Sequence, residues 1–382
     1  MTDAIRLLQE LVSIASVNPM GRPVQAEHRY EWPLTSYLED FFRRLGLAYE
    51  RQPVAPWREN IVAFFEPERP TGRILFEVHQ DTVPAEDMTV PPFAAQIVDG
   101  KLFGRGACDV KGAMAAMLAV LARLVRERPR QAAALTLACV VDEEYTFTGV
   151  QELVRRGLRA DLAIVAEPTR LQVVVAHKGA VRFRIHTEGR ACHSSQPWLG
   201  TNAILRMGRV LTALEEYADG LRRQPADPLL GLPTLNVGVI QGGITSNIVP
   251  HRCTIELDRR LLPNESPQQA LEDVMAYVRR YPRVDFPVLC EPPWLALPGL
   301  DRSGNSEAAR RLSRAVAKVL GTAEVAGVPY GTDASTLAAA GIPSVVFGPG
   351  DIAQAHTADE WVSIAQVRQA EEILYHLVTD TA

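Results

Sequence analysis

The chain contains few cysteines, and none of them forms a close pair. Its 382 residues include five cysteines, which are widely spread along the sequence. An odd number of cysteines without a CxxC motif argues against a disulfide framework and against a cysteine-based zinc knuckle. We therefore expect a cytoplasmic protein, in which Cys139 and Cys253 are buried structural thiols within strand-like runs.

Long apolar runs and a strong excess of one charge are also missing. No stretch of about 18 apolar residues occurs, so we expect no membrane-spanning helix. The opening segment is interrupted by Asp3, Arg6 and Glu10, which a secretory signal would not tolerate. The net charge is -5, from 45 acidic and 40 basic residues. This balance offers no basic surface to nucleic acid or to an anionic membrane, which leaves small polar molecules as the expected partners.

The apolar content is sufficient for two folded domains. Hydrophobic residues make up 47% of the chain and charged residues 22%, as in ordinary globular proteins. A chain of 382 residues exceeds what one hydrophobic core usually organises. No internal repeat or disordered tract interrupts it.

Buried strands alternate with helices in the first half of the chain. The runs RILFEV, ALTLACVV and DLAIVA are continuous and apolar, and GAMAAMLAVLARLVRE forms a long apolar helix between them. This order predicts an α/β fold with a mostly parallel sheet and helices on its faces. The same pattern returns after residue 291, in SEAARRLSRAVAKVL, PSVVFG and IAQVRQAEEILYHLV.

Between these two parts the order becomes strand, helix, strand, strand, helix, strand. That order is typical of a ferredoxin-like α+β module. We therefore predict one discontinuous domain of residues 1–176 and 291–382, with a module of residues 177–290 inserted into it.

Polar residues follow the buried strands directly, where α/β folds place their ligands. His79 and Asp81 in FEVHQDTVP face the same way in an extended chain, so Asp81 is expected to orient the imidazole of His79. Taken alone, His-x-Asp is common by chance. Asp109 lies in the glycine-rich turn GRGACDVKG before the long helix, where an isolated Asp would be read as an N-cap.

Three further strand ends carry acidic residues or a histidine. Asp142, Glu143 and Glu144 are consecutive, and three such acids repel one another unless a positive charge neutralises them, which favours a metal. Glu167 follows DLAIVA in VAEPT, and His356 lies in the loop FGPGDIAQAHTADEW. A lone loop histidine is usually unremarkable, so the argument depends on the whole set.

Two imidazoles and three carboxylates are enough for two metal ions if one carboxylate bridges. The candidate ligands are His79, Asp109, Glu144, Glu167 and His356, with Asp109 as the bridge. Two adjacent ions would polarise a carbonyl group and make a water acidic. Glu143 then remains as the general base, which takes the proton of that water and passes it to the leaving amine. Zinc is the expected metal, although manganese and cobalt suit the same ligands.

Together the motifs resemble the co-catalytic zinc peptidases, which include acetylornithine deacetylase, succinyl-diaminopimelate desuccinylase, aminoacylase and the glutamate carboxypeptidases. The resemblance runs from LVSIASVNP to the last helix and includes HQDTVP, GRGACDVKG, DEE, AEPT, HSSQPWLGTNAI, GGITSN and FGPGDIAQAHTADE in the family's order. It implies that His79 and Glu167 hold one metal, that Glu144 and His356 hold the other, and that Asp109 bridges them.

The resemblance also assigns roles to the inserted module. The module is implied to be a lid that often forms a homodimer interface, and His193 is implied to stabilise an oxyanion, commonly in the partner's active site. Asn247 and Arg260 are implied to bind substrate, Arg260 by gripping a carboxylate, with Arg259 as the alternative. In the second part of the discontinuous domain, Thr332 in GTDAS is implied to lie in a further substrate loop.

Two departures from the family pattern bear on the substrate. The bulky Tyr145-Thr146-Phe147 follows Glu144, and the charged Glu77 precedes His79. The loops look most similar to those of the acetylornithine deacetylase branch. We therefore expect a hydrolase that cuts the amide bond of a small N-acyl amino acid, with desuccinylase, dipeptidase or carboxypeptidase activity as alternatives. A binding protein without catalysis is disfavoured because Glu143 is retained, and a structural or regulatory dimer is a weaker alternative.

Overall fold

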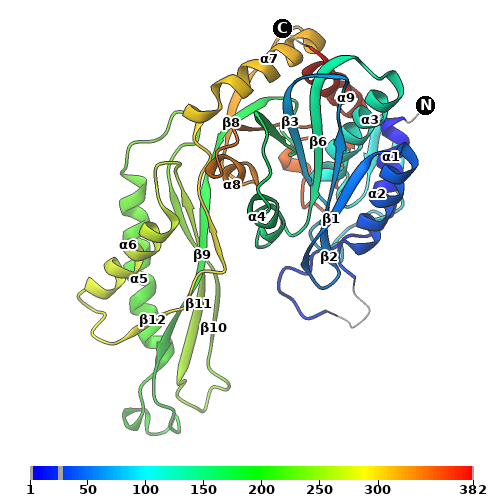
Figure 1. Ribbon diagram of the computed structural model, residues 1–382. Helices are drawn as coiled ribbons and strands as arrows, with labels where there is room; N and C mark the ends of the chain where they lie inside the picture. The colour runs from blue at the N-terminus through cyan, green and yellow to red at the C-terminus, as the bar shows by residue number, and fades with distance from the viewer. Residues whose placement is uncertain (1–2, 25–28, 381–382) are drawn as a thin grey trace. The chain divides into compact units, whose positions relative to one another are not determined.

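The computed structural model describes residues 3–24 and 29–380 and divides the chain into two compact units (Figure 1). The first unit consists of Met1–Val175, Arg302–Ala326 and Thr332–Ala382, and the second of Ala176–Asp301 and Gly327–Gly331. The second unit thus extends to Asp301, beyond the expected end at 290. It does so because β13 (Leu295–Leu297) pairs with β9 (Gly179–Glu188) of the same unit.

The first unit is built on an eight-stranded sheet with the order β1-β2-β6-β3-β7-β15-β8-β14. The four central strands, β6, β3, β7 and β15, are parallel, whereas β1 and β2 run antiparallel at one edge and β8 is antiparallel to β15. The predicted α/β fold is therefore confirmed. The strands are β1 (Ala48–Ala55), β2 (Arg58–Phe65), β3 (Arg69–His79), β6 (Gln131–Val140), β7 (Leu162–Val165), β8 (Val173–His177), β14 (Val325–Val328) and β15 (Ser344–Val346).

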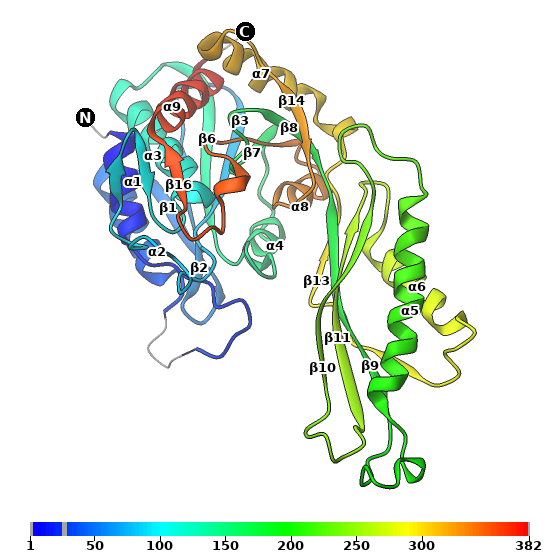
Figure 2. The ribbon, with the colours of Figure 1, turned by 180° about the vertical axis from the view of Figure 1, so that it is seen from behind.

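Helices cover both faces of this sheet. The helices α3 and α9 pack against one face with α1 beside them, and the short helices α4 and α8 lie on the other (Figures 1 and 2). A small sheet of β4 (Gln96–Val98), β5 (Lys101–Phe103) and β16 (Trp361–Ser363) completes the unit. The helices are α1 (Ala4–Ser13), α2 (Trp32–Leu45), α3 (Gly112–Glu127), α4 (Thr148–Arg155), α7 (Ser306–Leu320), α8 (Ala334–Ala339) and α9 (Ile364–Thr379).

The long helix α3 forms the centre of the first unit's core. It spans the residues predicted from the sequence and is buried on all sides from Gly112 to Ala122, because the sheet lies on one side and α1 and α9 on the other. A helix that is apolar all round needs such surroundings. The buried turn Ala107–Lys111, which contains Asp109, leads into this helix, so the core helps to fix the position of a predicted site residue.

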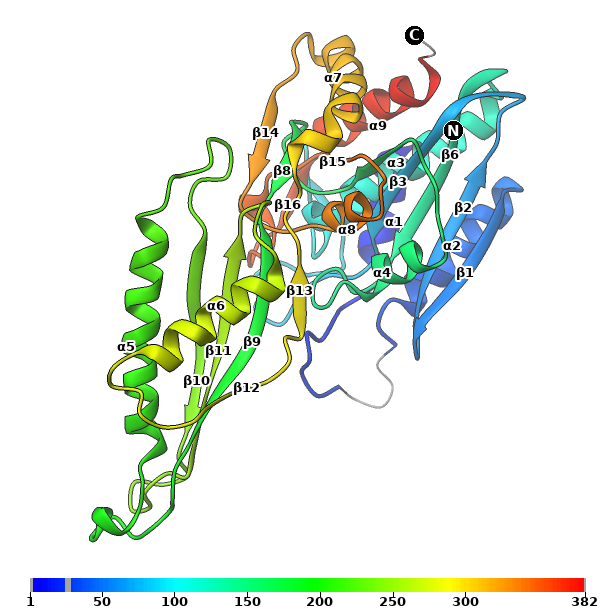
Figure 3. The ribbon, with the colours of Figure 1, turned by 60° about the vertical axis from the view of Figure 1, so that its left-hand side comes forward.

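The second unit has the predicted ferredoxin-like arrangement. Its antiparallel sheet has the order β10-β11-β9-β12, and α5 and α6 lie together on one face (Figure 3). Burial alternates along β11, and Cys253, Ile255 and Leu257 pack into the core beneath the helices. The remaining elements are α5 (Ala203–Arg222), β10 (Thr234–Gly242), β11 (Arg252–Leu261), α6 (Pro267–Arg280) and β12 (Val288–Cys290).

Throughout the described ranges, no helix combines the length and the apolar character that a bilayer-spanning segment needs.

Candidate metal centre

Three parallel strands of the first unit end side by side and deliver the predicted polar residues to one edge of the sheet. His79, the last residue of β3, pairs with Val140 at the end of β6, and Glu77 pairs with Val165 at the end of β7. The residues that follow β6 and β7 therefore emerge beside His79. Polar side chains at this edge occupy the usual ligand position of an α/β fold.

His79, Asp109 and Glu167 form one group of possible metal ligands. One ligand atom from each lies within 4.8 Å of the others, and all three residues are buried. Nε2 of His79 is 3.1 Å from Oδ1 of Asp109. Burial lowers the pKa of His79, but the contact with Asp109 and the neighbouring carboxylates raise it well above its usual value. Burial and the other acids raise the pKa of Glu167. A divalent cation at this position would stabilise the ionised carboxylates.

Asp109, Glu144 and His356 form a second group that shares Asp109 with the first. Nε2 of His356 lies 3.2 Å from Oε2 of Glu144 and 3.4 Å from Oδ2 of Asp109. Burial opposes a charge on this imidazole, but the hydrogen bonds to the two carboxylates raise the pKa of His356 to about 11. The five predicted ligands thus come together in two overlapping groups.

The spacing of these atoms fits divalent metal ions. Ligands at about 2.1 Å from a tetrahedral ion lie about 3.4 Å apart, close to the separations of 3.1 to 3.4 Å between the imidazoles and the carboxylates. Asp109 turns Oδ1 towards His79 and Oδ2 towards His356. That is the arrangement of a bridging carboxylate, and the donor set suits zinc, manganese or cobalt.

The turn that carries Asp109 is held by Glu360. This fully buried carboxylate accepts hydrogen bonds from the backbone nitrogens of Gly106, Cys108 and Asp109 at 3.1, 2.9 and 3.1 Å, and Arg105 donates to it at 2.6 Å. Gly106 has a φ of 81°, and a Cβ atom there would lie 2.6 Å from Thr82. In the sequence, Glu360 is only an acidic residue four positions after His356. Nothing in the neighbouring residues indicated that its carboxylate binds the turn of Asp109.

Asp81 supports the site differently from the sequence expectation. Nδ1 of His79 donates to the backbone oxygen of Asp81 at 2.9 Å, whereas the Asp81 carboxylate is 3.8 Å away from it. The carboxylate instead accepts from the backbone nitrogens of Glu143 and Glu144 at 3.2 and 3.1 Å. The backbone oxygen of Asp81 therefore engages Nδ1 of His79 and leaves Nε2 of the imidazole free to bind a metal. Its side chain holds the residues that follow β6.

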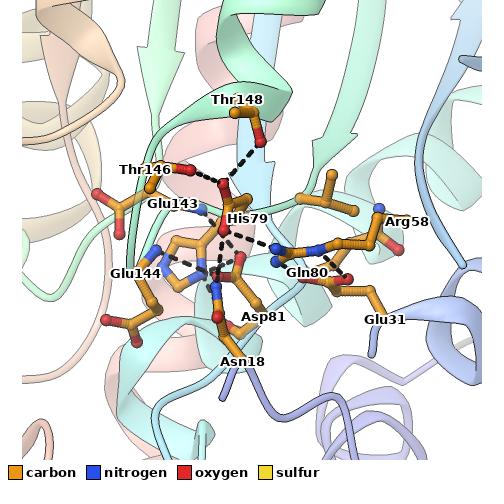
Figure 4. Close-up of polar contacts among 12 residues, drawn as sticks. Asn18, Glu31, Arg58, His79, Gln80, Asp81, Glu143, Glu144, Thr146 and Thr148 are labelled. Carbon is orange, nitrogen blue, oxygen red and sulfur yellow. Dashed lines mark hydrogen bonds and ion pairs between the residues drawn. The ribbon is translucent and has the colours of Figure 1, made fainter. Parts of the chain in front are cut away.

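The acidic turn, residues 142–147, carries three acidic residues. Asp142 is bound elsewhere, and only Glu143 and Glu144 are available to the candidate metal centre. Asp142 is neutralised by Arg58, whose Nη1 is 2.7 Å from Oδ1 of Asp142, rather than by a metal as the sequence suggested. Arg58 also pairs with Glu31 (Figure 4). Neither Arg58 nor Glu31 was recognised from the sequence. Glu143 and Glu144 are left for the chemistry of the centre.

Glu143 is buried beside the ligands. Within the described residues, no hydrogen-bond donor contacts its carboxylate, although its backbone nitrogen is held by Asp81. Burial raises its pKa well above the usual value, and the charges of Asp333, Glu144 and Asp109 add to the effect. A carboxylate with a raised affinity for protons is suited to general-base work.

His193 and Asn247 lie next to each other in the second unit. The backbone nitrogen of Ser194 donates to the oxygen of Asn247 at 3.0 Å, and both His193 and Asn247 are exposed. Nδ1 of His193 accepts from the backbone nitrogen of Ser195 at 3.1 Å. Because that nitrogen can only donate, the proton of the imidazole is on Nε2. His193 thus presents an exposed N–H donor.

The other predicted substrate residues are already engaged. Nε of Arg260 lies 2.9 Å from Oδ1 of Asp258, on the sheet face opposite α5 and α6. The guanidinium of Arg259 is buried and bound to Glu265, which removes it as the alternative on the surface. Thr332 is fully buried, and its hydroxyl accepts from the backbone nitrogen of Ala334 at 3.2 Å. The substrate roles of Arg260 and Thr332 stay predictions.

The structure shows what surrounds Tyr145 and Glu77, which belong to the two departures from the family pattern. The hydroxyl of Tyr145 lies against Gly21, where a Cβ atom would come within 2.4 Å of it. Glu77 and Asp333 are both buried; burial raises the pKa of Glu77 to about 8 and also raises that of Asp333. Tyr145 thus connects the acidic turn to the segment before α2.

Comparison with known proteins finds one family and named relatives within the deacetylases. The family described as peptidase family M20/M25/M40 matches residues 75–380. A curated relative from Myxococcus xanthus, named acetylornithine deacetylase, is 34% identical over 359 residues, which cover 91% of each chain. A second protein of that name, from Proteus mirabilis (strain HI4320), is 30% identical over 98% of this chain and 95% of its own.

Solved structures share the fold. An M20 family metallo-carboxypeptidase from Sulfolobus solfataricus superimposes with a TM-score of 0.81 at 20% identity, over 99% of this chain and 98% of that one. A dinuclear metal-binding peptidase of the M20 family from Bacillus subtilis superimposes with a TM-score of 0.69 at 15% identity, over 98% and 96%. At sequence identities of 20% and 15%, this similarity shows a shared fold.

Proposed function

This chain is a hydrolase that belongs to peptidase family M20/M25/M40, and we propose that it removes the acyl group from a small N-acyl amino acid. The observation that carries the proposal is the pair of ligand groups that share Asp109, with Glu143 buried beside them. The name of the two curated relatives, acetylornithine deacetylase, favours an acetyl group and a basic amino acid as the first substrates to test.

The ligands in this proposal are those predicted from the sequence. His79 and Glu167 would hold one ion and Glu144 and His356 the other, with Asp109 able to serve both groups. Two divalent ions at these positions, zinc in our proposal, would polarise the scissile carbonyl group and acidify a water between them. Manganese or cobalt would occupy the same ligands.

Glu143 moves the proton in the proposed reaction. Its carboxylate takes a proton from the attacking water while the water oxygen bonds to the carbonyl carbon. The same proton then passes to the amide nitrogen as the carbon–nitrogen bond breaks, which releases a carboxylic acid and a free amine. The absence of competing donors to this carboxylate within the described residues supports the assignment.

His193 is proposed to stabilise the negative charge that develops on the carbonyl oxygen. Its Nε2–H donor is set by the hydrogen bond from Ser195 to Nδ1, so it needs no change of tautomer to donate. A preorganised donor at such an oxygen contributes about 3 to 4 kcal/mol in other hydrolases. Asn247 and Arg260 are proposed to bind the substrate, with the Arg260 guanidinium exchanging Asp258 for a substrate carboxylate, and Thr332 is proposed to shape the substrate loop.

A substrate screen tests the proposed function. Metal-free protein is loaded with zinc, cobalt or manganese and assayed for release of a free amine from acetyl, succinyl and formyl amino acids and from dipeptides. We expect an acetylated basic amino acid to give the highest kcat/KM. Preference for a succinyl substrate or a dipeptide would redirect the proposal to a desuccinylase or a dipeptidase. Metal binding without any hydrolysis would favour a binding protein and overturn the proposal.

We also propose that the second unit forms a homodimer. The edge strand β10 exposes Val239 and Ile240, and Trp198, Leu205 and Ile244 are exposed on neighbouring segments of the same unit. An unpaired edge with exposed apolar residues is suited to association with a second copy. Sedimentation of the protein and of Ile240→Lys tests this, since the variant should be monomeric.

Mixing two inactive variants tests whether His193 acts in the partner's site. If it does, His193→Ala and Glu143→Gln should together recover about a quarter of the wild-type activity after subunit exchange. No recovery in a confirmed mixed dimer would assign His193 to its own subunit.

A cytoplasmic location is part of the proposal. All five cysteines are free, as expected in a reducing compartment. Cell fractionation with an antibody to the protein tests it.

A further inference from the structure

A buried polar network holds the acidic turn at its first residue, Asp142. Its centre is the carboxylate of Asp142, which accepts hydrogen bonds from four side chains. Arg58 and Asn18 donate to Oδ1 at 2.7 and 3.0 Å, while Thr148 donates to Oδ2 at 2.7 Å and Thr146 donates to the same oxygen. The side chain of Asp142 is only 2% exposed.

Arg58 connects three parts of the first unit through one guanidinium group. It is the first residue of β2, and it binds Glu31 at the start of α2 through Nε, at 3.0 Å, and through Nη2. Its remaining nitrogen, Nη1, reaches Asp142 after β6. Glu31 is fully buried and the Arg58 side chain is 12% exposed, so both charges depend on this contact. The planar fork of arginine can serve two carboxylates at once, which a lysine cannot do in the same geometry.

Asn18 joins the two strand ends that flank the centre. Its Nδ2 donates to Oδ2 of Asp81 at 2.9 Å and to Oδ1 of Asp142 at 3.0 Å (Figure 4 shows Asn18 beside Asp81). Its backbone nitrogen donates to the oxygen of Thr82 at 2.8 Å, which fixes Asn18 itself. The Asp81 carboxylate in turn holds the backbone nitrogens of Glu143 and Glu144.

The backbone of Asp142 requires such support. Its φ of 68° is in the left-handed region, which is unfavourable for an L-residue with a side chain. The backbone nitrogen of Phe147 donates to the oxygen of Asp142 at 2.7 Å and closes the turn. The direction in which Glu143 and Glu144 leave β6 is therefore determined at Asp142, by the groups that hold its carboxylate.

We propose that Arg58 and Asn18 are positioning residues that aim the acidic turn, so that Glu143 meets the attacking water and Glu144 meets its metal. The part that concerns Glu143 rests on the proposed function. Neither Arg58 nor Asn18 contacts a predicted ligand side chain; both act through Asp142, and Asn18 also acts through Asp81.

The alternative is an ion pair that only stabilises the fold, and kinetics separate the two. We expect Arg58→Gln and Asn18→Ala each to lower kcat about 10- to 100-fold while KM changes less than about threefold, the usual range for residues that orient metal ligands. Arg51→Gln is the matched control, because Arg51 on β1 makes ion pairs with Glu39 and Glu59. Its kcat should stay near that of the wild type even if its melting temperature falls.

A double-mutant cycle tests the route through Asp142. If Arg58 acts through this carboxylate, Arg58→Gln combined with Asp142→Asn should reduce kcat no further than Asp142→Asn alone. Multiplied losses in the double variant would mean that Arg58 acts by another route and would overturn the proposal.

Metal titration provides a readout that does not depend on turnover. Calorimetric titration of metal-free protein with zinc should show two binding events in the wild type. Arg58→Gln should weaken the event assigned to Glu144 and His356 about 10-fold or more and leave that of His79 and Glu167 unchanged. If the wild type is inactive in the substrate screen, the proposed function fails and this titration still decides the positioning role. If the wild type is active but the variants keep both kcat and zinc affinities within about twofold, the positioning role fails alone.

Discussion

The carboxylate of Asp81 lies 3.8 Å from Nδ1 of His79, whereas the backbone oxygen of Asp81 lies 2.9 Å from the same nitrogen. The imidazole is thus oriented by the main chain, and the side chain is free to hold the acidic turn. Two functions that are often combined in one carboxylate are here divided between the backbone and the side chain of one residue.

This division predicts a selective effect of Asp81→Asn. The hydrogen bond from His79 should persist, but the amide group presents only one acceptor oxygen to the two backbone nitrogens of Glu143 and Glu144. We expect kcat to fall about 10- to 100-fold while the ion held by His79 and Glu167 keeps its affinity. Steady-state kinetics and zinc titration measure the two effects. Loss of the His79 ion together with activity would show that the carboxylate orients the imidazole after all.

The proposed bridging role of Asp109 predicts the stoichiometry of metal binding. Asp109→Asn retains one good acceptor oxygen, so it can serve one ligand group but not both. We expect the metal content after dialysis, measured by elemental analysis, to fall from about two ions per chain to about one. Glu360→Gln, which disturbs the same turn from behind, should weaken both ions by less than Asp109→Asn does. Two tightly bound ions in Asp109→Asn would contradict the bridge.

His177 predicts an acid sensitivity in the second unit. Burial lowers its pKa from about 6.5 to about 4, and its Nδ1 donates to the backbone oxygen of Lys178 at 3.0 Å. The unfolded chain therefore binds a proton below pH 6.5 that the folded protein excludes, so stability decreases as the pH falls through this window. For His177 alone the loss between pH 7 and pH 5 is about 2 kcal/mol.

The variant His177→Asn isolates this contribution, since its amide can still donate to Lys178. Urea denaturation of both proteins at pH 7 and pH 5 gives the comparison. The variant should be less stable at pH 7 because a cavity remains, but its loss on acidification should be smaller by about 2 kcal/mol. Equal losses in the two proteins would rule out His177 as the source.

The sequence was sufficient to bring the candidate ligands together because four of the five lie at or after the end of an apolar strand. Parallel strands align their carboxyl ends, so His79 and Glu167 could be placed at one edge without coordinates. The order of strands and helices also predicted the mostly parallel sheet of the first unit and the ferredoxin-like sheet of the second. Asp109 could be included because it lies in the glycine-rich turn that leads into α3, where small residues allow a carboxylate to reach the edge of the sheet.

The groups that orient the ligands could not be predicted in this way. Arg58 and Glu360 lie in polar stretches, and Glu360 is buried and Arg58 largely covered only because distant parts of the chain pack over them. Their partners are 84 and 255 residues away, respectively, in the sequence. Strand β1 was missed because it lies at the edge of the sheet, contains no apolar run and buries only one of its residues. The end of the inserted module was set too early because β13 has only three residues.

The most direct test of the central claim is the hydrolysis rate of Glu143→Gln in metal-loaded protein. The amide has nearly the same shape as the carboxylate but cannot accept the proton of the water. We predict that kcat falls about 100- to 10,000-fold while zinc titration still shows two bound ions. A kcat within about twofold of the wild-type value, with both ions bound, would contradict the assignment of Glu143 as the general base of this centre.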